Sequence, residues 1–280
     1  MSSIPQAGVM KIVPRPRWGS WVLAGSVLLL LAILVIAGIK ARIIDVRIFL
    51  LYLTGPEVLR GAFNAVVLGT LSLFLAAVLG FILALMRLSD NKILSGMSSA
   101  YIYFFRGTPM LIQLLFWFNA FPAMFPRLTL SVPFTDIVLV DAAMSSVVTP
   151  FLAALAGLAL AESAYMGEII RAGILAVDRG QRQAATALGM TQGQVMRHVV
   201  APQAFRIILP AAGNQYIMLL KSTSLASTIG YLELLRVAAD IYSANFRVVE
   251  LITVCAFWYL VMTAVATGLQ GALEKRFPLR

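Results

Sequence analysis

The chain has 280 residues, of which 60% are hydrophobic and only 12% are charged. This apolar excess indicates a membrane protein rather than a soluble domain, so a lipid bilayer is an expected partner. A formal net charge of +10 would suggest nucleic acid in a soluble chain. Here the basic residues lie in loops and at helix ends, where membrane topology and anionic lipid account for them, and no nucleic-acid partner is expected.

Residues 1–18 are polar and proline-containing, and we expect a cytoplasmic tail there. The apolar run 19–39 is long enough to cross a bilayer. A cleaved signal peptide is the alternative, but the run is too long for a typical signal core and no clear cleavage site follows. Residues 19–57 are therefore predicted to form an N-terminal membrane helix followed by an external connection.

A second span is predicted over 58–87. Its many small residues suit close helix contact in lipid, and Asn64 and Thr70 are its polar members. A third span is predicted over 95–120. It contains Arg106, and a kink is expected at Pro109, three residues further on. The proline-rich segment 121–146 is expected to be an external loop.

The fourth span is predicted over 147–172. It contains Glu162, and a carboxylate inside a span needs a partner or a wet cavity. Glu168 and Arg171, three residues apart near its inner end, are spaced for a helical ion pair. Spans over 203–221 and 247–270 follow, with a hydroxyl-rich stretch after the fifth span, and 271–280 is expected to be a second cytoplasmic tail.

The distribution of Lys and Arg predicts the orientation of the chain. With six spans and the N-terminus inside, thirteen of these residues lie on the cytoplasmic side and eight outside, and Arg106 lies within a span. Positive residues favour the cytoplasmic side, so both termini are expected there. The polar segment 178–202 then also faces the cytoplasm.

Helix signals persist in the polar segment 178–202. We expect one helix over Gln181–Leu188 with a small apolar face, ended by a left-handed Gly189. A second helix begins at Thr191, where Gln194 completes a capping-box pattern, and is expected to end at Pro202. The result is a polar helical hairpin; an ordinary cytoplasmic loop is the alternative.

This hairpin resembles the EAA loop of permease subunits in ATP-binding-cassette (ABC) importers. The matching letters are Gln183-Ala184-Ala185, three residues, Gly189, nine residues, and Val199-Val200-Ala201-Pro202. Gln183 replaces the acid of the motif, and Ala201 replaces its Leu. The resemblance implies that an ATPase subunit contacts this hairpin through Gln183, Ala184, Ala185, Leu188, Gly189, Met190 and Pro202.

Further stretches are similar to the branch of this family that imports polar amino acids and opines, namely 106–118, 163–177, 180–190, 201–230 and 231–235. The resemblance implies an all-α membrane protein with the fold of a type I ABC importer transmembrane domain over residues 58–270. About six membrane helices are expected, five in the core and one added at the N-terminus. It also implies a location in the bacterial inner membrane.

The partners that the resemblance implies are two ATPase subunits, a second permease subunit (a copy or a paralogue), and a periplasmic or lipid-anchored binding protein. The chain itself has no Walker-type phosphate loop, since the dipeptide Gly-Lys never occurs. ATP is therefore expected on the partner ATPase, with no cofactor in this chain. One Cys, one His and no catalytic constellation argue against an enzyme and against a Cys/His metal site.

Two transport functions remain at this point: a permease subunit of an ATP-driven amino-acid or opine importer, and a stand-alone secondary carrier or channel. A zwitterionic cargo needs acceptors for its ammonium group and donors for its carboxylate. Glu162 is a candidate for the first role. Candidates for polar contacts along the pathway are Asn64, Thr70, Lys221, Ser222, Thr223 and Ser224. The structural alternative is that Asn64 and Thr70 bond one helix to another and that Glu162 pairs with a basic residue in the bundle.

Overall fold

The computed structural model describes residues 45–131 and 138–277, together with a few positions between 21 and 33. It divides into two compact units, Met1–Arg47 and Ile48–Arg280. The predicted tail 1–18 and most of the predicted helix 19–39 lie outside the described residues. All elements discussed below from Ile48 onward belong to the second unit.

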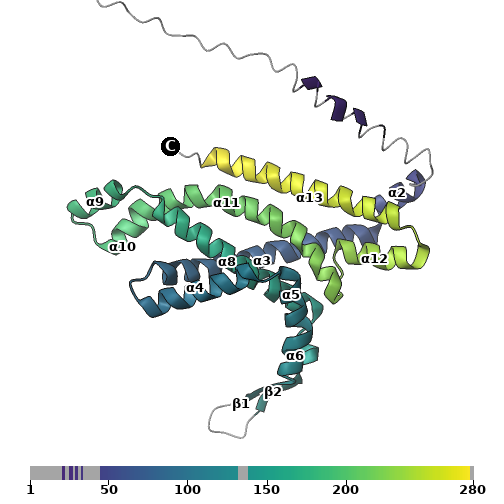
Figure 1. The fold of residues 1–280 in the computed structure, drawn as a ribbon, viewed down its shortest axis with the longest axis horizontal. Helices are drawn as coiled ribbons and strands as arrows, with labels where there is room; N and C mark the ends of the chain where they lie inside the picture. Colours follow the sequence, from purple (N-terminus) through teal and green to yellow (C-terminus); the bar gives the residue numbers. More distant parts are fainter. Residues whose placement is uncertain are drawn as a thin grey trace, which may run out of the picture. The chain divides into compact units, whose positions relative to one another are not determined.

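Long helices form most of the second unit (Figure 1). Within the described ranges, three of them are long and apolar enough to cross a membrane: α3 (Pro56–Leu88), α8 (Pro150–Leu175) and α13 (Val248–Arg276). The short α2 (Val46–Leu53) precedes them, and α11 (Ala201–Ser222) packs against α8 and α13. The predicted second, fourth, fifth and sixth spans thus correspond to α3, α8, α11 and α13.

Small residues allow α3 and α8 to pack closely. A Cβ atom added to Gly80 of α3 would lie 2.7 Å from the Cβ of Met166 and 2.8 Å from the main-chain nitrogen of Gly167. Only glycine permits this approach of two backbones. At the other end of α3, a Cβ on Gly61 would lie 3.0 Å from the Cα of Leu234. The small residues of the second span therefore have the packing role expected from the sequence.

The third predicted span is not one kinked helix. α4 (Lys92–Gly107) ends at Thr108, and α5 (Met110–Leu115) begins after Pro109, with both intervening residues extended. Proline disfavours helical backbone in the residue before it, which turns the expected kink into a break. The amide of Gln113 donates to the carbonyls of Phe105 and Thr108 and so satisfies acceptors that the break exposes.

The segment after α5 is structured rather than a loop. A π-helical turn (Phe116–Ala120) and α6 (Phe121–Met124) lead into β1 (Arg127–Ser131), which pairs antiparallel with β2 (Val138–Ala143). The short α7 (Met144–Val147) returns the chain to α8. The segment predicted as an external loop therefore contains short helices and two paired strands. The all-α description holds for the helical bundle but not for this β-ribbon.

After α11 the hydroxyl-rich stretch forms a 3₁₀ helix (Thr223–Ile229) and then α12 (Leu234–Asn245), which packs between α3 and α13. Glu233 caps α12 by accepting from the main-chain amides of Leu235 and Arg236, and Tyr259 donates a third hydrogen bond at 2.7 Å. Burial raises the pKa of the Glu233 carboxyl, and these three donors oppose the rise. The carboxylate thus joins α12 to α13.

Candidate functional site: a capped hairpin and buried polar groups

The first hairpin helix, α9, spans Arg179–Ala187. It begins two residues earlier than predicted because Asp178 acts as its N-cap, with Oδ1 accepting from the amides of Gly180 at 2.7 Å and Gln181 at 3.3 Å. An N-cap carboxylate also interacts favourably with the helix dipole. The signal was present in the sequence at Asp178.

Gly189 ends α9 as predicted. Its φ of +81° is left-handed, its amide donates to the carbonyl of Thr186, and the amide of Met190 donates to that of Ala185. These two bonds define a Schellman motif, which satisfies the last carbonyls of a helix. The turn between the hairpin helices is therefore set by local geometry.

The second hairpin helix, α10 (Gln192–Val195), has the predicted capping box. The amide of Gln194 donates to Thr191 Oγ1, and Oε1 of Gln194 accepts from the amide of Thr191 at 2.8 Å. The predicted end at Pro202 is wrong, because a π-helical turn (Met196–Val200) leads without interruption into α11. The helix continues through Pro202 because the preceding π-helical turn already departs from the i→i−4 hydrogen bonding that a proline interrupts.

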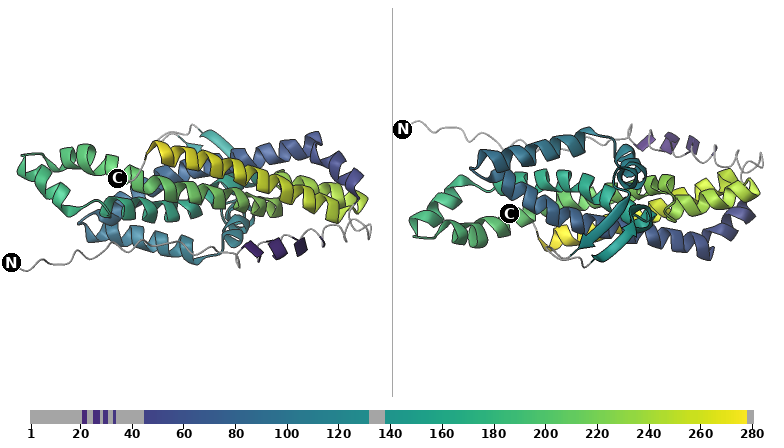
Figure 2. Two further views of the ribbon diagram at one scale, coloured as in Figure 1. Left: turned by 90° about the horizontal axis from the view of Figure 1, so that it is seen from above. Right: turned by 90° about the horizontal axis from the view of Figure 1, so that it is seen from below.

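The hairpin is anchored to the ends of α8 and α11, beyond which it projects (Figure 2). Ala185, Val195 and Val200 are buried in one cluster with Ile170 and Ile174 of α8. The guanidinium of Arg182 donates to the main-chain carbonyl of Ile174. Packing and this bond together hold the hairpin rigidly against the bundle.

The predicted coupling residues divide between two faces of the hairpin. Gln183, Ala184, Gly189 and Pro202 are exposed, and Leu188 at the tip is 84% exposed. Met190 is half-buried, and Ala185 is only 4% exposed because it packs against the bundle. The exposed members of the set are therefore available to another molecule, whereas Ala185 is used for packing within this chain.

Glu162 is buried in the middle of α8, at 2% exposure. Gln215 of α11 interacts with its carboxyl group, while Oε1 lacks a hydrogen-bond partner. The next residue of α11, Tyr216, shares a 2.9 Å hydrogen bond with Thr70 of α3. Glu162 and Thr70 are predictable from the sequence as polar residues within apolar spans, but their partners on α11 carry no local signal.

The remaining pathway candidates lie elsewhere. Asn64 donates to the carbonyl of Leu232 at 2.8 Å and so joins α3 to the segment before α12. The exposed Lys221 lines a cavity of about 330 Å³ together with Ser222 and Ser224. Thr223 is fully buried and donates to the carbonyl of Leu220. The candidates thus have different partners in this chain, and their role along the pathway stays a prediction.

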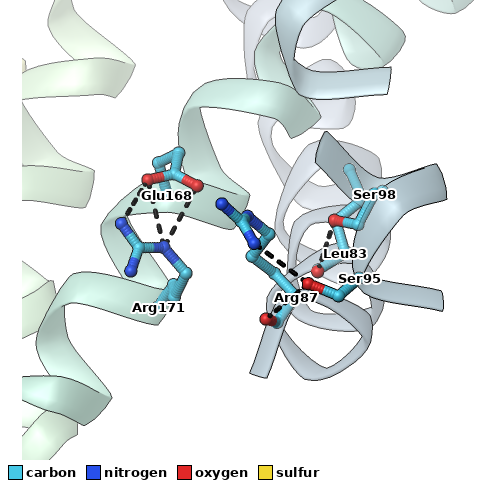
Figure 3. Close-up of polar contacts among 6 residues, drawn as sticks. All are labelled: Leu83, Arg87, Ser95, Ser98, Glu168 and Arg171. Atoms are coloured by element: carbon cyan, nitrogen blue, oxygen red, sulfur yellow. Dashed lines mark hydrogen bonds and ion pairs between the residues drawn. The ribbon is translucent and has the colours of Figure 1, made fainter. Parts of the chain in front are cut away.

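The predicted ion pair near the inner end of the fourth span forms as expected. Arg171 donates from Nε to both carboxylate oxygens of Glu168 at 3.1 Å and from a terminal nitrogen at 2.7 Å (Figure 3). Arg87 of α3 lies beside this pair and donates to the hydroxyl of Ser95 at 2.9 Å. The guanidinium groups of α3 and α8 thus lie beside the first turn of α4.

Known proteins match both the sequence and the structure. A family model described as binding-protein-dependent transport system inner membrane component matches residues 76–278. The chain is 38% identical over 277 residues to the arginine transport system permease protein ArgU of Corynebacterium glutamicum, covering 99% of this chain and 85% of that protein. It is 37% identical to the nopaline transport system permease protein NocM of Agrobacterium fabrum, covering 76% of this chain and 85% of that one.

Solved structures agree with these relatives. The crystal structure of an amino acid ABC transporter with histidines superposes with a TM-score of 0.71 at 36% identity, covering 83% of this chain and 99% of that chain. An inward-facing structure of the methionine ABC transporter MetNI shares the fold, with a TM-score of 0.64 at 17% identity over 79% of this chain and 96% of that one. The type I ABC importer fold expected from the sequence is confirmed.

Proposed function

The chain belongs to the family of inner-membrane components of binding-protein-dependent transport systems, and from this premise we propose that it is the permease subunit through which an ATP-driven importer moves a polar amino acid or an opine. Its relatives include permease proteins for arginine, nopaline and glutamine transport. This family membership favours the importer over a stand-alone carrier or channel.

The observation that carries the proposal is the rigid hairpin of α9 and α10 at the end of α8 and α11. Its helices are capped at both starts and joined by a Schellman turn. A stiff element of this kind transmits rigid-body motion, whereas a loop would absorb it. An ATPase subunit docks on the exposed face that carries Gln183, Ala184, Leu188 and Gly189, while Ala185 holds that face on the bundle.

The complete assembly contains two ATPase subunits, a second permease subunit and a periplasmic or lipid-anchored binding protein. ATP is bound by the ATPase subunits, because this chain has no phosphate loop. Both termini and the hairpin lie in the cytoplasm, in agreement with the distribution of basic residues. Closure of the ATPase pair moves the two hairpins and opens the pathway outward.

The cargo ammonium group is accepted by Glu162. Its Oε1 is buried without a partner, and an unpaired carboxylate oxygen inside a span attracts a cation. Thr70 and Tyr216 supply hydroxyl groups from adjoining helices. Asn64 and the segment from Lys221 to Ser224 offer polar groups at other positions along the pathway.

The test of transport uses proteoliposomes that contain the permease with its ATPase subunits and binding protein. Uptake of a radiolabelled amino acid or opine is expected only when ATP and the binding protein are both present. The permease alone should neither hydrolyse ATP nor accumulate cargo. Uptake by the permease alone under an ion gradient would instead establish the secondary carrier.

The test of docking replaces one small residue on the exposed face. Ala184→Asp is expected to abolish copurification of the ATPase while membrane insertion survives, because a carboxylate enters the packed contact. Gln181→Asp is the matched control, since it places the same charge in the exposed first turn of α9, where the helix dipole favours it. Normal ATPase association of Ala184→Asp would exclude this face as the docking surface.

A further inference from the structure

A groove between α3, α4 and α8 is more basic than acidic. Its volume is about 490 Å³, and Arg87, Arg106, Tyr103, Tyr165 and Glu168 are among the residues that line it. Neither the coupling hairpin nor the proposed cargo contacts include any of these residues. Neither the docking of the ATPase nor the binding of cargo therefore accounts for this basic groove.

The acidic charge in the groove is already neutralised. Arg171 binds both oxygens of Glu168. Arg87 donates to the hydroxyl of Ser95, and Figure 3 shows it lying between that hydroxyl and the Glu168–Arg171 pair. Arg106 lies 5.1 Å from the centre of the Tyr165 ring. In the described part of the chain, neither Arg87 nor Arg106 forms an ion pair with a carboxylate.

Two guanidinium charges thus remain for a ligand. A guanidinium presents a planar fork of donors that matches the oxygen atoms of a phosphate group. Both side chains are exposed enough to reach a ligand in the groove. Two arginines that line one groove therefore offer the donors that a phosphate ester requires.

The position of the groove indicates where this phosphate comes from. Arg87 lies in the last turn of α3, and Glu168 precedes the end of α8 by seven residues, or about 10 Å of helical rise. At 26 residues, α8 is about 39 Å long and exceeds a hydrocarbon core of about 30 Å. Its last turns can therefore lie at the level of the lipid headgroups, at the hairpin end of the bundle.

The outer face of α4 is suited to acyl chains. Ile93, Met97, Tyr103 and Phe104 are 73%, 59%, 83% and 57% exposed, and Tyr103 also lines the groove. A soluble phosphate would gain nothing from this apolar rim, whereas a lipid would bury it. We propose that the groove of Arg87 and Arg106 binds the phosphate headgroup of an anionic phospholipid, with the acyl chains along α4.

The test measures lipid binding by native mass spectrometry of the purified transporter that contains the full-length chain. Phosphatidylglycerol is expected to bind at least tenfold more tightly than phosphatidylcholine. The double variant Arg87→Gln/Arg106→Gln should weaken phosphatidylglycerol binding about 30-fold, or about 2 kcal/mol at 1.4 kcal/mol per tenfold, at about 1 kcal/mol for each basic residue. Arg197→Gln/Arg206→Gln removes the same charge from exposed positions outside the groove and should retain the binding.

A second variant leaves both arginines in place. Ser99→Glu adds a carboxylate to the groove, where it pairs with the guanidinium groups and should displace the lipid without loss of thermal stability. Equal losses in the two double variants would overturn the proposal, because they would mean non-specific attraction. Binding of inorganic phosphate or glycerol phosphate as tightly as phosphatidylglycerol would also overturn it in favour of a soluble anion.

Discussion

The guanidinium of Arg182, on the first hairpin helix, donates a hydrogen bond to the main-chain carbonyl of Ile174 near the end of α8. Ile174 is 6% exposed and belongs to the cluster that also holds Ala185 and Val195 of the hairpin. A carbonyl group near the C-terminal end of α8 is therefore hydrogen-bonded by a charged side chain from a different helix. This bond connects the proposed docking surface directly to the bundle.

Arg182→Gln is expected to loosen the hairpin. A hydrogen bond from a charged donor contributes about 1.5–3 kcal/mol, and the effect should fall near the lower value because Nε of Arg182 is buried without a partner. Hydrogen–deuterium exchange in α9 should accelerate about tenfold, and cargo transport per ATP should fall. Arg179→Gln, at the exposed start of α9, should change neither. Unaltered exchange in the Arg182 variant would show that packing alone holds the hairpin.

Gly189 and Gly193 form a matched pair within the hairpin. Neither has an atom within 4 Å of an added Cβ, but only Gly189 has a positive φ. Gly189→Ala should destabilise the turn by about 1–2 kcal/mol and weaken ATPase binding, because a Cβ is unfavourable in left-handed backbone. Gly193→Ala lies within α10 and should be neutral or stabilising. ATPase copurification compares them, and equal retention by both variants would contradict a role for the Schellman turn.

Gly80 controls the contact between α3 and α8. Gly80→Ala should lower the free energy of unfolding by about 1–3 kcal/mol, since the new methyl group meets Met166 and the backbone of Gly167. The unfolding temperature in detergent is the measurement. The control is Gly96→Ala in α4, where an added Cβ meets nothing within 4 Å. A stability of Gly80→Ala equal to that of the control would mean that the two helices separate without cost.

Glu162→Gln tests the proposed contact with the cargo ammonium. The amide keeps the size of the side chain but removes its charge, so the KM for cargo should rise at least tenfold. Thermal stability should be retained or increased, because a buried neutral amide costs less than a buried carboxylate. Asp90→Asn, in the exposed turn between α3 and α4, is the control and should transport normally. A normal KM in Glu162→Gln would exclude this carboxylate from cargo binding.

Removal of the ion pair between Arg127 and Asp141 should have only a small effect on stability. The two charges meet at 2.6 Å across β1 and β2, but their side chains are 68% and 42% exposed. Solvent screens such pairs, so Arg127→Ala should cost less than about 1 kcal/mol of stability. Thermal unfolding of the purified chain is the measurement. A loss of several kcal/mol would contradict the screening by solvent and show that this pair contributes much of the stability of the ribbon.

Local chemistry explains which predictions succeeded. Gly189 ends its helix, and Thr191 with Gln194 begins the next, because caps and turns depend on atoms only a few residues apart. The Glu168–Arg171 pair follows from helical spacing alone. The long apolar runs likewise predicted α3, α8 and α13, since hydropathy is a sum over neighbouring residues.

Predictions failed where two local tendencies competed. Pro109 broke the third span instead of bending it, and Pro202 continued into α11 instead of ending α10. Proline interrupts the helix at one position and not at the other. A π-helical turn (Met196–Val200) precedes Pro202, whereas Thr108 before Pro109 is extended. The paired strands within 121–146 were obscured by prolines that indicate a loop.

By itself, the sequence determined a membrane protein with an EAA-like hairpin and the caps and turn of that hairpin, because those signals are local. The tertiary structure decided which face of the hairpin is exposed: Leu188 is 84% exposed, while Ala185 is buried in a cluster with Ile170 and Ile174 of α8. It also brought Gln215 to Glu162 across two helices. The physical reason is that burial and pairing between distant helices depend on which side chains pack together, and spacing along one segment does not encode this.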